Sequence, residues 1–211
     1  MTASETILYD YHYSSAAYRL RLALALLDMD YTPVPVDLRA GAHLEPEHRA
    51  RNPQGFVPAL WIDGRMLTQS VAILEYLDET RSVGWLPRDA VGRQRVRTLA
   101  HVIAMDIHPV CNLSVARAGS GDGDIGPWMH RFIPRGLEAF EALLDDPATG
   151  RFCHGDRVGL ADLCLLPQLF NADRWGVPVA HLERIGRVRA ALEEIPALAA
   201  AHPEQVKPPE A

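Results

Sequence analysis

The sequence is poor in the features that mark nucleic-acid-binding and membrane proteins. Of its 21 basic residues only Lys207 is a lysine, the formal net charge is -6, and no basic face stands out. Proteins that bind nucleic acid normally carry a clustered excess of positive charge, so we expect no nucleic-acid partner. No uninterrupted apolar run reaches ten residues, whereas a helix that spans a bilayer needs ~20, so we expect no membrane partner.

Patterns for cysteine pairing and for metal binding are also absent from the sequence. Cys111, Cys153 and Cys164 show no C-x-x-C spacing, and an odd number of cysteines without a pairing pattern is typical of a reducing compartment. The stretch MTASETILYD has neither a basic n-region nor an apolar h-region, which argues against a signal peptide. We therefore expect a cytoplasmic protein. His43 and His48 do not share a helix face, so the sequence indicates no metal site.

The first part of the chain alternates between strand and helix patterns. The stretch TILYDY predicts a strand at 6–11, and a stripe of apolar residues predicts a helix over 15–29. The two prolines in YTPVPVDL place a strand at 31–38 at the edge of a sheet, because proline cannot donate to a neighbouring strand. A short polar helix is expected at 43–51.

A hairpin and a third helix complete this part of the chain. In FVPALWIDGRMLTQS two apolar runs flank Asp63-Gly64, which is a strong hairpin signal. Pro58 lies inside the first run, and a cis bond between Val57 and Pro58 would place it in a turn that leads into the strand. The stretch VAILEYLDET then predicts a helix with Ser70 near its N-cap.

The pattern changes after residue 80. The stretch TRSVGWLPRDAVG is rich in turn formers and is typical of a linker. Beyond it, the long patterns predict helices at 89–118, 127–146, 159–175 and 181–194. An α/β part joined to an all-α part is a two-domain plan. We assign residues 1–80 to the first domain, 81–91 to a linker and 92–211 to the second domain.

Two serines, Ser14 and Ser15, stand directly before the first predicted helix. The ordinary interpretation is helix capping, in which a serine oxygen accepts a backbone N–H. The alternative is anion binding, because a helix N-terminus carries partial positive charge and free N–H donors. A hydroxyl at this place can also donate to a thiolate and lower its pKa.

Two further segments bear on this choice. In a fold of this order the first and last helices of the small domain begin at the same edge of the sheet, so Gln69-Ser70 is expected beside Ser14-Ser15. Val57-Pro58 lies at that edge as well, where its backbone N–H and C=O can pair with an extended peptide. Together the three segments indicate a site for a small, acidic, peptide-like thiol.

The residues at these segments resemble those of the zeta-class glutathione transferases, which include maleylacetoacetate and maleylpyruvate isomerases. The stretch SSAAYRLRLAL is similar to the class signature Ser-Ser-Cys-x-x-Arg-Val-Arg-Ile-Ala-Leu. Further similar segments, between about residues 6 and 180, are NPQGFVPAL, TQSVAILEYLDE, DIHPVCNLSV and LADLCLLPQLFNADRW. The resemblance implies a thioredoxin-like N-terminal domain (βαβαββα) followed by an all-helical C-terminal domain.

The resemblance also implies roles for individual residues, with glutathione as the cofactor. Ser14 or Ser15 would stabilise its thiolate, and the segment of Val57 and Pro58 would pair with its cysteinyl backbone. Gln69 and Ser70 would hold the γ-glutamyl group. The other glutathione-binding positions are His43 and Gln54, near the glycyl end, and His108 and Asn112, in the helical domain. Tyr13 and Arg174 would bind the substrate.

The chain departs from the class pattern around the serine pair. Class members commonly carry arginine where this chain has Tyr13, and cysteine where it has Ala16. Maleylpyruvate isomerases place basic residues after the position of Asn112, where this chain has Leu113-Ser114. Of the arginines that could grip a dicarboxylate, the motif comparison therefore retains Arg174.

Three functions remain open at this point. The first is a cis–trans isomerase that acts on a small unsaturated keto acid by reversible addition of the glutathione thiolate to the conjugated C=C. The second is a transferase that conjugates or dehalogenates small electrophiles. The third is a binding protein of the same fold without catalytic activity. The resemblance also implies a homodimer.

Overall fold

The computed structural model describes residues 5–121 and 123–207, and the chain divides into two compact units. The first unit contains the described residues up to Arg81 together with those from Pro196 onward. The second unit runs from Ser82 to Ile195 and begins where the linker was expected.

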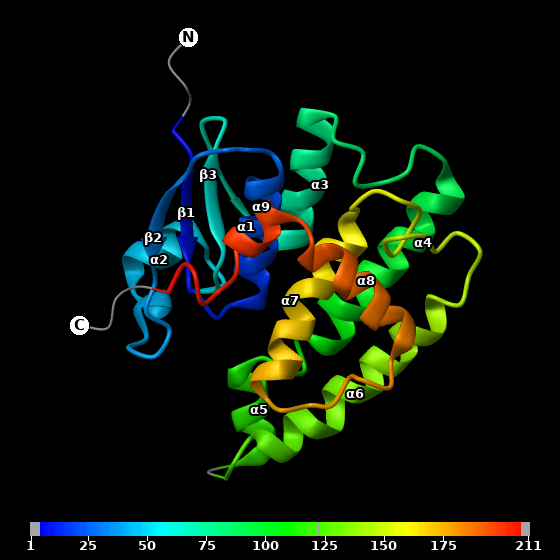
Figure 1. Cartoon of the computed structure of the whole chain (residues 1–211). Helices are drawn as coiled ribbons and strands as arrows, with labels where there is room; N and C mark the ends of the chain where they lie inside the picture. The colour runs from blue at the N-terminus through cyan, green and yellow to red at the C-terminus, as the bar shows by residue number, and fades with distance from the viewer. Residues whose placement is uncertain (1–4, 122, 208–211) are drawn as a thin grey trace. The chain divides into compact units, whose positions relative to one another are not determined.

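The first unit is built on a four-stranded mixed sheet in the order β2-β1-β3-β4 (Figure 1). The strands are β1 (Ile7–Asp10), β2 (Thr32–Pro35), β3 (Ala59–Ile62) and β4 (Arg65–Thr68). β1 is parallel to β2 and antiparallel to β3, which pairs antiparallel with β4. The proline-containing strand lies at the edge, as predicted. Asp63 and Gly64 form the predicted hairpin turn, both with positive φ, 53° and 73°.

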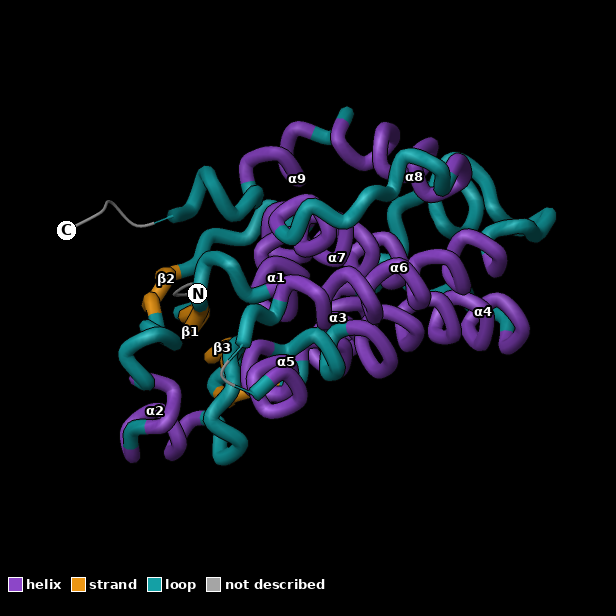
Figure 2. Tube along the Cα trace, turned by 90° about the horizontal axis from the view of Figure 1, so that it is seen from below, coloured by secondary structure: helices purple, strands orange, loops and turns teal. Residues whose placement is uncertain are grey.

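Helices lie on both faces of this sheet (Figure 2). α1 (Ser15–Leu26) and α3 (Ser70–Arg81) pack against each other on one face. The short α2 (Pro46–Arg51), preceded by the 3-10 turn η1 (Ala42–Leu44), lies on the other face. The strand and helix order is the thioredoxin-like order βαβαββα, so this prediction is confirmed.

The C-terminal segment differs from the expected domain division. Its short helix α9 (Pro196–Ala200) packs on α1, and the side chain of Arg21 donates from Nε to the carbonyl of Ala201 over 3.3 Å. The rings of Tyr18 and His202 form a T-shaped contact, with their centroids 6.1 Å apart. These contacts explain why the segment belongs to the first unit, although it follows the helical unit in sequence.

The second unit is all-helical. Its α-helices are α4 (Ala90–His101), α5 (Leu113–Ser120), α6 (Gly126–Leu143), α7 (Leu160–Arg174) and α8 (Glu183–Glu193). α7 is the central helix, because ten consecutive residues from Leu160 to Leu169 are buried and it packs against both α4 and α8. Within the described ranges, no helix combines the length and the apolar character that crossing a bilayer requires.

The single helix expected at 89–118 is interrupted in the structure. α4 continues into a π-helical segment, η2 (Val102–Ile107), the chain then turns, and α5 starts after Asn112. Pro109 lacks a backbone N–H, and the side chain of Asn112 starts a new helix, so the apolar period alone could not reveal the break. η2 packs closely on α6, where a Cβ at Gly136 would lie 2.2 Å from the Ile107 side chain.

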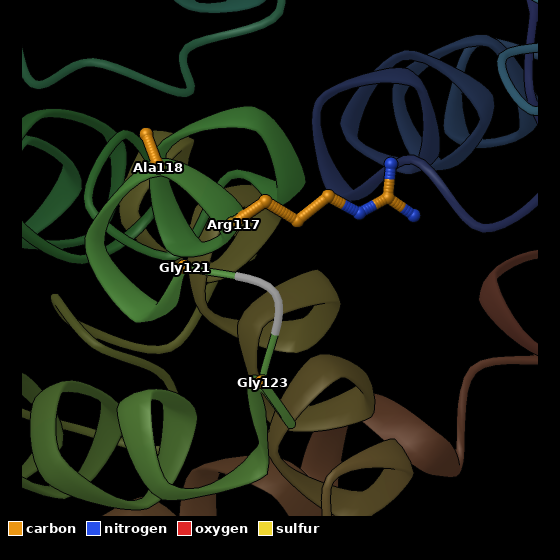
Figure 3. A pocket seen from close by; sticks show the side chains of 4 residues that line it. All are labelled: Arg117, Ala118, Gly121 and Gly123. Carbon is orange, nitrogen blue, oxygen red and sulfur yellow. The ribbon is translucent and has the colours of Figure 1, made fainter.

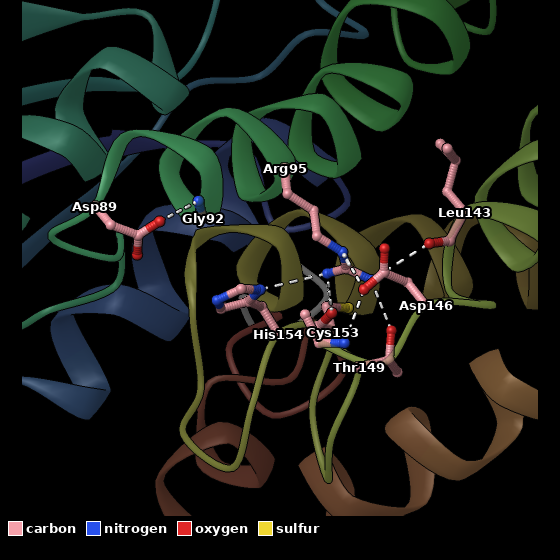
Figure 4. A network of polar contacts seen from close by, with 9 residues as sticks. Asp89, Gly92, Arg95, Leu143, Asp146, Thr149, Cys153 and His154 are labelled. Carbon is pink, nitrogen blue, oxygen red and sulfur yellow. Dashed lines mark hydrogen bonds and ion pairs between the residues drawn. The ribbon is translucent and has the colours of Figure 1, made fainter.

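A polar network around Arg95 joins α4 to the segment between α6 and α7 (Figure 4). The guanidinium donates to the Cys153 carbonyl at 2.8 Å, to the Thr149 hydroxyl at 2.7 Å and to the Leu143 carbonyl at 3.3 Å. It also pairs with Asp146 at 3.4 Å. The Arg95 side chain is 14% exposed, so removing it would leave several of these acceptors without a partner.

We predict that Arg95→Met lowers the free energy of unfolding by about 1–3 kcal/mol, because partly buried acceptors lose a charged donor. Urea denaturation measures this loss. Arg187→Met is the matched control, since Arg187 is exposed and makes no hydrogen bond or ion pair with the described residues. The control should change stability by less than about 0.5 kcal/mol. Equal losses in both variants would contradict a special role for the network.

Candidate active site

One edge of the sheet brings the three predicted segments together. Ala59, the first residue of β3, pairs with Tyr9 near the end of β1 and with Thr68 at the end of β4. The chain after β1, the chain before β3 and the chain after β4 therefore lie side by side. These segments carry Ser14-Ser15, Val57-Pro58 and Gln69-Ser70, so the expected common edge is confirmed.

Ser14 is the residue that caps α1. Its backbone is extended, with φ -71° and ψ 116°, and its Oγ accepts the N–H of Ala17 over 3.2 Å. Its own N–H donates to the Tyr11 carbonyl at 2.7 Å, which closes the turn before the helix. A hydroxyl has two lone pairs and one proton, so an oxygen that accepts a helix N–H can still donate its proton. Capping and anion binding are therefore compatible at this one hydroxyl.

The surroundings distinguish the two serines and show the place of Tyr13. Ser15 opens α1 and is 6% exposed, whereas Ser14 is half-buried. Before them lies an aromatic cluster of Tyr11, His12 and Tyr13, in which the His12 ring lies 4.7 Å and 4.1 Å from its two neighbours. Burial lowers the pKa of His12, which favours its neutral form. Ser14 is thus the more accessible hydroxyl, beside an aromatic flank.

In the turn before β3, the Phe56 carbonyl is hydrogen-bonded, whereas the backbone of Val57 has no such bond among the residues that the structure describes. The Val57-Pro58 bond is cis, as predicted. The carbonyl of Phe56 accepts from Nδ2 of Asn52 at 2.9 Å and lies 2.8 Å from Nε2 of His48. By contrast, nothing in the described part of the chain forms a hydrogen bond with the backbone of Val57. The donor and acceptor of Val57 can therefore pair with an external peptide group.

Gln69, Ser70 and Gln54 form the adjoining part of the edge. Nε2 of Gln69 donates to Oε1 of Gln54 over 2.6 Å, which brings together two of the predicted residues. Gln69 is exposed and has a positive φ of 68°. Ser70 opens α3 and is buried, and its hydroxyl accepts from Nη1 of Arg19 at 3.1 Å. The start of α3 therefore offers an exposed amide beside a hydroxyl that is held by a cation.

His43 lies in η1, on the segment that leads into α2. Burial lowers the pKa of its imidazole, and the charges of His48 and Arg49 act in the same direction. Its Nδ1 is buried and has no hydrogen-bond partner among the residues described. A buried polar atom without a partner costs about 1–3 kcal/mol, so this nitrogen would gain from a ligand that supplies one.

The helical unit holds the remaining predicted residues on separate elements. His108 follows η2 and is half-buried. Asn112 caps α5: its Oδ1 accepts from the N–H and the hydroxyl of Ser114 at 3.0 and 2.9 Å. Arg174 lies exposed in the last turn of α7, with its guanidinium 5.9 Å from the Phe170 ring. The structure gives Asn112 a folding role, and its amide NH2 can still donate elsewhere.

A second arginine of this unit, Arg117, is not among the predicted residues. It lies on the exposed side of α5 and lines a shallow surface depression with Ala118, Gly121 and Gly123 (Figure 3). Its guanidinium extends away from the helix. A search for basic residues directly after Asn112 does not find it, because it lies about one helical turn further along the chain.

Comparison with known proteins agrees with this geometry. Residues 4–79 match the family described as "Glutathione S-transferase, N-terminal domain" and residues 127–202 the corresponding C-terminal domain. The chain is 56% identical to a maleylacetoacetate isomerase of Rhizobium meliloti (strain 1021), over 98% of this chain and 100% of that protein. The chain belongs to the glutathione S-transferase family.

Two solved structures of the family narrow the class. A maleylpyruvate isomerase, described as a bacterial glutathione S-transferase of the zeta class, is 39% identical and superposes with a TM-score of 0.90, covering 97% of this chain and 100% of that one. A maleylacetoacetate isomerase from Methylobacterium extorquens AM1, solved with malonate and glutathione, is 38% identical with a TM-score of 0.91 and the same coverage. The resemblance to zeta-class glutathione transferases is therefore confirmed.

The sequence did not reveal the residues that hold the backbone segments on which the expected site residues lie. Asn52 and His48 hold the Phe56 carbonyl beside the site. Arg21 contacts the loop that precedes Ser14, since its Nη2 donates to the His12 carbonyl at 2.9 Å. Arg21 stands in the signature stretch, but the sequence does not show where its side chain points.

The three cysteines of this transferase lie outside the predicted chemistry. All are free thiols and are buried. Burial raises the pKa of Cys111 to about 11, and burial followed by the Asp162 carboxylate raises that of Cys153 well above its ordinary value. A thiol reacts as its thiolate, so we expect Cys111 and Cys153 to react slowly at neutral pH.

We predict that none of the three thiols reacts rapidly with a disulfide reagent at pH 7 in the folded protein, and that all three react after unfolding in urea. Spectrophotometric thiol titration measures both states. Activity with glutathione should persist after the native protein is treated and the reagent removed. Fast modification of one thiol with loss of activity would point to a cysteine in the mechanism.

Proposed function

We propose that this protein is a glutathione-dependent cis–trans isomerase of a small unsaturated keto acid of the maleylacetoacetate or maleylpyruvate type. The observation that carries the proposal is the hydroxyl of Ser14. It caps α1 while half-buried at the sheet edge that also bears Val57 and Gln69. The name of the Rhizobium relative, 56% identical over nearly the whole chain, supports the same activity.

The residues of the first unit fit glutathione as a cofactor. The backbone of Val57 offers a donor and an acceptor for the cysteinyl residue of a peptide. Gln69 and Ser70, with Gln54 beside them, suit a γ-glutamyl group because they offer two side-chain amides, one hydroxyl and helix N–H donors. Nδ1 of His43 is buried and has no hydrogen-bond partner among the described residues, so it suits contact with the glycyl end of glutathione.

When bound, glutathione supplies a thiolate that adds reversibly to the conjugated C=C, so the bond can rotate and the thiol is released unchanged. The Ser14 hydroxyl would donate a hydrogen bond to the sulfur, which stabilises the thiolate and so lowers the pKa of the thiol. The N-terminus of α1 favours negative charge at the same place. Ser15 is the first residue of α1 and is buried, so we assign it to the packing of the helix start.

We assign substrate binding to the helical unit. Arg174 is exposed and offers a planar donor pair that suits a carboxylate. His108 and the NH2 group of Asn112 are the further donors for a substrate oxygen on which negative charge develops. In the first unit, Tyr13 supplies an aromatic edge next to Ser14 where other members carry arginine.

We also propose that the enzyme is a cytoplasmic homodimer. The cytoplasmic assignment is supported by the three free cysteines, which suit a reducing compartment. The homodimer is the assembly that the resemblance to the zeta-class glutathione transferases implies.

A second candidate is a transferase that conjugates or dehalogenates small electrophiles. The aromatic cluster of Tyr11, His12 and Tyr13 favours it, because a surface with Tyr13 in place of arginine accepts a less charged substrate.

An isomerase leaves the amount of free glutathione unchanged, whereas conjugation consumes it. We predict that turnover of maleylpyruvate conserves the free thiol, as a thiol assay during the reaction would measure. Stoichiometric loss of thiol would favour the transferase.

We predict that Ser14→Ala lowers kcat with maleylpyruvate at least about tenfold, since a donor to developing negative charge is lost. Ser14→Thr should restore most of the rate because it keeps a hydroxyl. Steady-state kinetics at saturating glutathione measures both.

The control separates chemistry from capping. Asp89 caps α4 by accepting the N–H of Gly92 at 2.8 Å, so Asp89→Ala should cost a similar ~1 kcal/mol of stability but leave kcat unchanged. Full activity in Ser14→Ala would rule out a mechanism based on Ser14.

A further inference from the structure

The side chain of Arg21 joins the end of β1 and the loop that follows it to the C-terminal segment of the first unit. It is 1% exposed, and each nitrogen of its guanidinium contacts a different residue. Nη1 lies 2.5 Å from Oδ2 of Asp10 at the end of β1, Nη2 donates to the His12 carbonyl at 2.9 Å, and Nε donates to the Ala201 carbonyl at 3.3 Å. The guanidinium carbon also lies 5.1 Å from the centre of the Tyr18 ring.

Two of these contacts fix the loop that carries Ser14. The loop leaves β1 after Asp10, and its fold is closed by the hydrogen bond from Ser14 N–H to the Tyr11 carbonyl. The bond from Arg21 to His12 holds the middle of the same loop. Because Arg21 itself lies on α1, it ties the loop to the helix that Ser14 caps.

The third contact comes from the C-terminal segment. α9 packs on α1, and the carbonyl of Ala201, the residue after α9, accepts a hydrogen bond from Nε of Arg21. This is the guanidinium nitrogen that contacts neither Asp10 nor His12. The ring of His202 also lies 6.1 Å from that of Tyr18, so the segment stays packed on α1 beyond Ala201. The tail that follows the helical unit thus completes the surroundings of the loop.

The buried ion pair of Arg21 and Asp10 costs free energy, because both charges are removed from water. Burial raises the pKa of Asp10 although Arg21 opposes it, and Oδ1 of Asp10 has no hydrogen-bond partner in the described structure. Burying an ion pair costs several kcal/mol per ion, and apolar residues of similar volume are often as stable. Stability alone therefore gives little reason for this arrangement, whereas accurate placement of a loop does.

We propose that Arg21 is a positioning residue for Ser14, and that the C-terminal segment acts as a strap that holds the Arg21 fork through the Ala201 carbonyl. This inference rests on the proposed function, because it concerns the hydroxyl assigned to the thiolate. A lysine could keep the charge but not the three-way geometry of the fork. Loss of the fork lets the loop shift, and a shift of ~1 Å at a reacting group can cost about 100-fold in rate.

The test compares Arg21→Lys with the wild-type protein in two measurements. In the ligand-free protein, amide hydrogen exchange should become faster at 11–15 and at 202–207 together, because both segments lose the same anchor. In the protein saturated with glutathione, a pH titration of thiolate ultraviolet absorbance should show the thiol pKa moving toward the free value of ~8.5. The kcat should fall about 10- to 100-fold, with a smaller change in KM for glutathione.

Tyr76→Phe is the matched control for lost stability. The hydroxyl of Tyr76 donates to Oδ2 of Asp63 at 2.7 Å in the same unit, at the β3–β4 hairpin. The control should lower the melting temperature without changing the thiol pKa or the exchange at 11–15. If Arg21→Lys behaves like this control, Arg21 is only structural and the inference is wrong.

Asp10→Asn provides a second route if Arg21→Lys does not fold. It keeps the shape and an acceptor for Arg21 but removes the charge, so it should change exchange and thiol pKa in the same direction and by less. An unchanged thiol pKa in this variant would also overturn the inference. Failure of the wild-type protein to bind glutathione or to lower its thiol pKa would instead refute the proposed function, whatever the exchange measurement shows.

Discussion

The pairing of Ala59 with two strands is the constraint on which the site depends. Ala59 is opposite Tyr9 on one side and Thr68 on the other, so the ends of β1 and β4 and the start of β3 share an edge. A slip of one residue in either pairing would move the side chains of the slipped strand to the opposite face of the sheet. The buried faces prevent such a slip, since Leu8, Leu60 and Ala59 are fully buried.

From this edge the site follows by elementary electrostatics. Two helices, α1 and α3, begin there, and each begins with a serine. Their N-termini present partial positive charge and N–H donors to an acidic ligand. Ser14 shows how one hydroxyl serves two purposes, because it accepts a helix N–H and keeps a proton to donate. The structure thus removes the apparent conflict between a cap and an anion site.

Much of the first unit could be predicted from the sequence because its signals are local. The hairpin at Asp63-Gly64, the edge position of the strand with two prolines and the start of α1 each depend on a few neighbouring residues. The break between α4 and α5 was missed, since the apolar period runs through it and the cap at Asn112 is a side-chain contact. The attachment of the tail to the first unit was missed because it depends on contacts between residues far apart in the chain.

The supporting contacts of the site were beyond the sequence because they join distant positions. Arg21 and Ala201 are 180 residues apart, and nothing in the composition of either stretch indicates the bond. The same holds for Arg19 and Ser70. The family resemblance implied which residues would face glutathione, whereas the structure shows what holds those residues in place.

The most direct measurement of the central claim is a crystal structure of this protein with glutathione bound. The account predicts that the sulfur lies within hydrogen-bonding distance of Oγ of Ser14, and that the cysteinyl backbone pairs with both polar groups of Val57. A sulfur held by another side chain, with the Ser14 hydroxyl directed away from it, would contradict the account.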